Sequence, residues 1–149
     1  MSRLHRRAHR GQALVEFALI LPIFILLLVG IFDMGRAVYD YNVISNAARQ
    51  AMRVAIVDQN TTAITNEAVQ HSIGIATASN VTVQFVDTAT ATTYSQCPPA
   101  PNGCKLGWQA VVTVTYDYTA ATPVIGNLVG TIGMASTSKQ AIENVYTSP

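Results

Sequence analysis

The chain has 149 residues, enough for one small domain beside a membrane segment but not for two. Half of its residues are hydrophobic and only 11% are charged, an oily composition for a water-soluble protein. Four of the nine basic residues precede Gly11, so the formal net charge of +1 hides an asymmetry. Without residues 1–11, five basic residues face eight acidic ones, a net charge of −3, which excludes the basic surface of a nucleic-acid-binding protein.

An apolar segment follows this basic tail. Residues 13–32 carry a single charge, Glu16, and as a helix they span about 30 Å, the thickness of the hydrocarbon core of a bilayer. Positive charge precedes the segment and mixed charge follows it, so we expect a cytoplasmic amino terminus and an extracytoplasmic chain from Asp33 onward. The segment is longer than the core of a cleaved secretory signal and lacks its small-residue cleavage site. An uncleaved signal anchor remains the alternative.

Apolar periodicity continues past residue 32. Small or apolar residues recur in alternating steps of three and four at Ile31, Met34, Val38, Tyr41, Ser45, Ala48, Met52 and Ala55. This near-heptad spacing predicts one continuous helix over about residues 13–57, roughly 65 Å long. We expect its first half in lipid and its second half against a folded domain or a neighbouring subunit.

The start of this helix resembles a known family. Residues 11–22 read GQALVEFALILP, and Gly11-Gln12 with Glu16 and Phe17 resembles the processing site of type IV prepilins. Within that superfamily the stretch is similar to the TadE-like pseudopilins of tight-adherence pilus systems, as are residues 30–36 (GIFDMGR) and 46–53 (NAARQAMR). The resemblance implies a leader over residues 1–11, which a prepilin peptidase removes by cutting between Gly11 and Gln12. It also implies assembly with other pilin or pseudopilin subunits, as a homo- or hetero-oligomer.

Glu16 and Phe17 complete the assembly and processing motif that the resemblance implies. Cleavage leaves a new α-amino group on Gln12, opposite in charge to the Glu16 carboxylate of a neighbouring subunit. Both groups are poorly solvated in a bilayer, so pairing them offsets two desolvation costs. The alternative is that Glu16 reaches the nearby headgroups by itself, as charges near helix ends do.

The remaining chain predicts a short helix and strands. A helix capped by Thr61 or Thr62 is expected to reach about Ala78. Alternating apolar residues predict strands over residues 80–87 and 108–118, joined as an antiparallel hairpin, and a weaker third strand over residues 131–142. Residues 88–93 are expected to be a linker, and residues 124–129 a helical turn or loop.

Two cysteines, Cys97 and Cys104, flank a proline-rich turn. In an oxidising compartment this arrangement favours a disulfide that closes a short loop. Two free thiols are the competing interpretation. A metal site is a weaker one, because zinc needs four ligands and no histidine is close in sequence.

These elements predict an α+β, pilin-like fold in which a long helix over residues 12–57 is followed by an extracytoplasmic domain over residues 58–149. That domain combines the short helix with a small antiparallel sheet. We expect a structural subunit, a minor pilin or an assembly component, that is not an enzyme and has no cofactor, metal or small-molecule substrate. His71 is the only histidine outside the leader, and we expect it to be solvated or packed. A membrane-tethered binding module with an uncleaved anchor is the alternative function.

Overall fold

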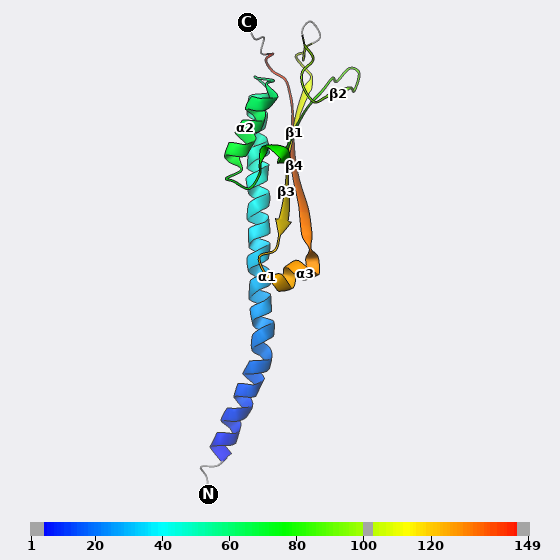
Figure 1. Ribbon diagram of the computed structural model, residues 1–149. Helices are drawn as coiled ribbons and strands as arrows, with labels where there is room; N and C mark the ends of the chain where they lie inside the picture. Colours follow the sequence, from blue (N-terminus) through cyan, green and yellow to red (C-terminus); the bar gives the residue numbers. More distant parts are fainter. Residues whose placement is uncertain (1–4, 100–102, 146–149) are drawn as a thin grey trace.

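One long helix, α1, sets the shape of the molecule. The computed structural model describes residues 5–99 and 103–145, so the start of the expected leader (1–4), part of the proline-rich loop (100–102) and residues 146–149 lie outside the described residues. Helix α1 (His5–Ala55) is continuous, as predicted, but it also includes the described part of the leader and ends at Ala55 (Figure 1). Its lower part bends in Figure 1, which fits the presence of Pro22, because proline removes one backbone hydrogen bond.

A short helix, α2 (Thr61–His71), turns back along the upper end of α1. Its cap is Asn60, whose side chain accepts hydrogen bonds from the backbone of Thr62 and Ala63, so the prediction of a threonine cap is wrong. The predicted end at Ala78 is also wrong. The backbone adopts positive φ at Ile73 (52°) and Gly74 (78°), and such a reversal of the backbone ends a right-handed helix.

A four-stranded antiparallel sheet completes the fold, with strand order β2-β1-β3-β4. After the 3-10 turn η1 (Ala78–Asn80) the strands are β1 (Val81–Val86), β2 (Thr93–Tyr94), β3 (Gln109–Thr119) and β4 (Thr131–Ala141), with the short helix α3 (Pro123–Val129) before the last. The predicted hairpin is present, with Val83 opposite Val112. Strand β2 lies at the end of the stretch predicted as a linker, where two residues pair with β1.

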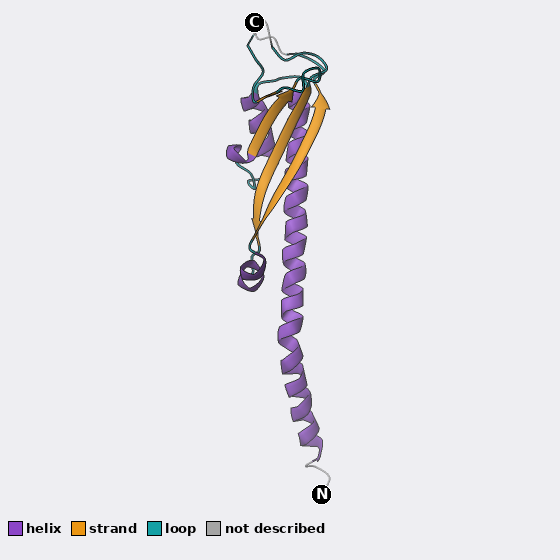
Figure 2. Ribbon diagram, turned by 90° about the vertical axis from the view of Figure 1, so that its right-hand side faces the viewer, coloured by secondary structure: helices purple, strands orange, loops and turns teal. Residues whose placement is uncertain are grey.

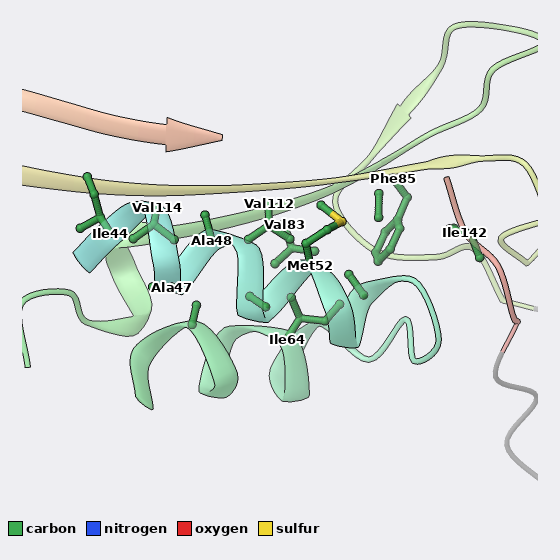
Figure 3. Packing of buried hydrophobic residues seen from close by; sticks show 14 of the residues in the cluster. Ile44, Ala47, Ala48, Met52, Ile64, Val83, Phe85, Val112, Val114 and Ile142 are labelled. Atoms are coloured by element: carbon green, nitrogen blue, oxygen red, sulfur yellow. The ribbon is translucent and has the colours of Figure 1, made fainter. Parts of the chain in front are cut away.

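The core lies where the upper half of α1 is enclosed between α2 and the sheet (Figure 3). Alanines at 47, 48, 51 and 55 are fully buried and allow close approach of both layers. Ile64 of α2 packs from one side, and Phe85 and Val112 of the sheet pack from the other. The α+β, pilin-like fold expected from the sequence is therefore confirmed, and its core uses only the upper half of the long helix.

Candidate functional site

The residues of the expected processing motif lie at the free end of α1. Gly11, Gln12, Glu16 and Phe17 are all exposed, and the sheet domain lies at the opposite end of the molecule (Figure 2). Gly11, Gln12 and Glu16 share one side of the helix, where they line a shallow depression together with two apolar neighbours. Phe17 is not part of this depression, because consecutive helix residues point about 100° apart.

Glu16 forms no ion pair in the part of the chain that the structure describes. Over that part, the one ion pair joins Glu67 Oε1 to His71 Nε2, 3.0 Å apart and one helical turn away. His71, which we expected to be solvated or packed, is partly exposed and contacts this acid. Within the described ranges, no three histidine, cysteine, aspartate or glutamate side chains come together as a metal site would require.

Helix α1 exposes its entire apolar lower half. Every residue from 11 to 28 is exposed, so the chain's own domain does not cover this surface. The helix is long and apolar enough to cross a membrane, a property that a membrane anchor and a signal sequence share. An apolar surface of this length must be covered by lipid or by another protein surface, because water cannot solvate it favourably.

The stripe of small and apolar residues between Ile31 and Ala55, predicted from its near-heptad spacing, divides into two parts. Ala48, Met52 and Ala55 are buried in the core, whereas Met34 and Val38 are exposed just above the apolar segment. The upper part of the stripe therefore packs within the subunit. The lower part remains free to contact another molecule.

Asp33 accepts hydrogen bonds from residues far away in the chain, whereas the sequence indicated only a charge next to the apolar segment. Its side chain is 7% exposed although it follows directly after the apolar segment. It accepts hydrogen bonds from the Ala121 backbone nitrogen (3.1 Å) and from the Thr122 hydroxyl, and its backbone carbonyl accepts one from the Tyr118 hydroxyl (2.8 Å). Asp33 thus joins α1 to the segment between β3 and α3.

Two pKa values reflect this junction. The hydrogen bond from the Thr122 hydroxyl, with smaller contributions from backbone amides and Arg36, lowers the pKa of Asp33 below its ordinary value of 3.8. Burial and the negative charge of Asp33 raise the pKa of Tyr118, so its hydroxyl stays protonated and can donate. The Arg36 guanidinium carbon lies 5.8 Å from the centre of the Tyr118 ring, within the range of a cation–π contact.

The two cysteines form a disulfide at the far end of the molecule. The Cys97–Cys104 bond closes a loop beside Trp108, whose ring stacks on Tyr94 with centroids 5.3 Å apart. The processing motif lies in the first turns of α1, at the opposite end of the molecule, so the structure does not bring the disulfide together with this motif (Figure 1).

Comparison with known protein families gives a match that lies within α1. Residues 11–53 match the TadE-like protein family. The resemblance recognised from the sequence is confirmed over this segment, which begins at Gly11 and ends two residues before α1 does. The TadE-like segment includes Glu16, Asp33 and the exposed stripe, whereas the sheet lies beyond it. No curated protein and no solved structure matches the chain.

Proposed function

We propose that this TadE-like chain is a structural subunit of a tight-adherence or related pilus, as a minor pilin or an assembly component. A prepilin peptidase removes residues 1–11 on the cytoplasmic side, and α1 holds the mature subunit in the membrane with its domain outside. The observation that carries this proposal is Glu16, an acid on an exposed apolar helix that forms no ion pair in the described part of its own chain.

The position of Gln12 supports an intermolecular partner for Glu16. Both residues line the same depression, one helical turn apart. A neighbouring copy that is shifted along the helix axis can place its Gln12 amine at this Glu16 while the two apolar helices pack together. Charge pairing then sets the stagger between subunits, and apolar contact supplies the attraction.

Exposed apolar residues above the bilayer segment provide a second contact between subunits. Val38 and Tyr41 lie on the same helix as Glu16 but beyond the segment that lipid would cover. Single exposed apolar side chains are common on soluble proteins, but a stripe continuous with an exposed helix indicates an interaction surface.

The substitution Glu16→Ala tests the proposal. The variant should lose its leader and enter the membrane normally but be absent from sheared filaments. Glu16→Ala leaves the amine of the neighbouring copy unpaired, and an unpaired charge in the membrane costs roughly 2.5–3.5 kcal/mol. Each 1.4 kcal/mol is tenfold, so incorporation should fall by about tenfold or more. Glu16→Gln should show the same loss because it keeps the side-chain volume without the charge. Gln12→Ala should be tolerated, since it preserves the amine.

The intact mass of the mature protein shows whether the leader has been removed, and it is the control for the Glu16 variants. Mature protein that begins at Gln12, together with loss of Glu16 variants from filaments, supports the pilus subunit. Normal filaments built from Glu16→Ala protein would contradict the assembly role. A mature protein that retains Gly11 and its basic leader would instead favour a tethered binding module, because the pairing amine would not exist.

A further inference from the structure

The short helix α3 lies beside the apolar half of α1. In Figure 1 it extends across the direction of α1, and in Figure 2 it is seen nearly end-on, so it lies crosswise to the long helix. A groove of about 470 Å³ separates them, lined by Leu21, Ile25 and Val29 on α1 and by Pro123 and Ile125 on α3. If α1 crosses a bilayer through residues 13–32, α3 lies level with the outer part of that span.

The chain around α3 has the composition of a membrane contact. No charged residue occurs between Asp117 and Lys139, a stretch that includes all of α3 and most of β4. Val129 at the end of α3 is 53% exposed and Ile132 at the start of β4 is 42% exposed. These side chains extend the uncovered apolar surface of α1 onto the sheet domain.

Charged and amphipathic groups mark a boundary above α3. Asp33 and Arg36 are the first charges after the apolar segment, and Arg36 lies over the Tyr118 ring. Arginine and tyrosine are typical of the headgroup level, where an apolar body and a polar tip are both accommodated. The groove between α1 and α3 reaches from Thr122, which binds Asp33, down to Leu21, about three helical turns below Asp33 along α1.

The backbone around α3 is also suited to an apolar environment. The Ala121 amide donates to Asp33, and Pro123 has no amide hydrogen to satisfy. Gly126 donates to the Thr122 carbonyl (2.8 Å), and Gly130 donates to the Gly126 carbonyl (2.9 Å). These internal hydrogen bonds reduce, without removing, the cost of placing the segment at the edge of the hydrocarbon region, because the first turn of α3 has no side-chain cap.

We propose that α3 and its flanking residues, 120–132, form a second membrane contact in the leaflet nearest the sheet domain. The occupant of the surface is phospholipid, with acyl chains against the groove and Val129. The boundary with the headgroups lies at the level of Arg36, Tyr118 and Ile132, the strand partner of Tyr118. Because residues 117–139 carry charge only at their ends, binding depends on apolar area and not on anionic lipid. This inference rests on the proposed membrane insertion of α1. It adds that two elements, joined through Asp33, set the height and rotation of the domain on the bilayer.

Site-directed spin labelling of the full chain in phosphatidylcholine vesicles tests the contact. Both native cysteines are in the disulfide, so a single added cysteine is the only free thiol to label. The label is placed at Val129→Cys, with Ile132→Cys as a second reporter in case one variant is perturbed. Phe24→Cys reports the span of α1, and Lys139→Cys reports the exposed upper end of β4.

The readout is the ratio of accessibility to oxygen, which concentrates in lipid, over accessibility to a water-soluble nickel complex. We expect this ratio to be several-fold higher at Val129 and Ile132 than at Lys139, and highest at Phe24. Added phosphatidylglycerol should leave the result unchanged.

Three results would overturn the inference. Labels at Val129 and Ile132 that behave like the one at Lys139, while Phe24 lies in lipid, would leave α1 as the only membrane contact. Labels shielded from both reagents would mean that protein, such as a second copy, covers α3. An aqueous label at Phe24 would remove the membrane span itself and the contact with it.

Discussion

A single carboxylate, Asp33, connects the middle of α1 to the segment between β3 and α3. Asp33 is the first charge after the apolar segment, and its hydrogen bonds reach Ala121 and Thr122, 88 and 89 residues later in the chain. Buried acids are costly unless hydrogen bonds satisfy their oxygens, and here each oxygen has a donor. The side chain therefore determines where the β3–α3 segment attaches to α1.

The pH dependence of stability should report this carboxylate. Its pKa is lowered in the folded state, so its stabilising contribution is complete above the unfolded value of 3.8 and is lost as pH falls through the folded pKa. The urea midpoint of the full chain in detergent, followed by Trp108 fluorescence, should decrease as pH falls below about 4. Asp33→Asn should weaken this decrease.

Other ionisable groups also contribute to the pH dependence of stability, so variants of these groups serve as controls. Tyr118 faces Asp33 and its pKa is raised, so its hydroxyl stays protonated at acid pH, and the Arg36 guanidinium lies over the Tyr118 ring. Asp87, whose pKa is lowered by the Ala89 amide, contributes in the same direction from a different loop. Asp87→Asn should remove a separate part of the decrease. Identical pH profiles for wild type and Asp33→Asn would show that ionisation of Asp33 does not contribute to the pH dependence of stability.

At the scale of elements, α1 serves two purposes along one continuous helix. Its upper part carries small residues such as Ala47, Ala48 and Ala51, which let α2 and the sheet pack closely on opposite sides. Its lower part carries large apolar residues and no covering element of its own over residues 11–28. The change from small to large side chains therefore coincides with the change from side chains that the chain's own domain covers to side chains that it leaves exposed.

The loop between β2 and β3 depends on its disulfide. Closing a loop over a separation of seven residues is expected to stabilise the folded state by about 2–3 kcal/mol. The double variant Cys97→Ser, Cys104→Ser should lose about that much, measured by urea unfolding of the sheet domain. Helix content from α1 should remain.

Chemical reduction provides the matched control. Reductant should lower the urea midpoint of the wild-type protein to that of the double serine variant and should leave that variant unchanged. A wild-type midpoint that reductant does not shift would mean that the disulfide contributes no net stability.

At the scale of the whole molecule, the folded domain and the membrane anchor should be separable. Phe85 is fully buried in the sheet core, and Phe85→Ala should cost roughly 3–5 kcal/mol, a large fraction of the stability of a small domain. Trp108 fluorescence should show unfolding at lower denaturant. The protein should still sediment with membranes, because residues 13–32 do not need the sheet to partition into lipid.

Phe32→Ala is the comparison variant, because Phe32 is 79% exposed and lies at the end of the apolar segment. It should leave the unfolding of the domain unchanged. Release of Phe85→Ala protein from membranes would contradict the separation of anchor and domain.

The sequence alone determined the features that depend on local patterns. Apolar length and periodicity predicted α1, and alternation predicted β1, β3 and β4, because each pattern is read from residues close together in the chain. The motif around Gly11 and Glu16 was likewise local and led to the TadE-like resemblance.

Tertiary structure decided what depends on distant pairing. Strand β2 exists only because β1 offers it an edge, and no local pattern marks Thr93 and Tyr94. The docking of α3 and the role of Asp33 arise because the β3–β4 hairpin returns the chain to α1 after more than 80 residues. Neighbours in sequence specify short segments. The burial of a carboxylate and the docking of a helix beside α1 depend instead on which distant groups the fold brings within hydrogen-bond or van der Waals range.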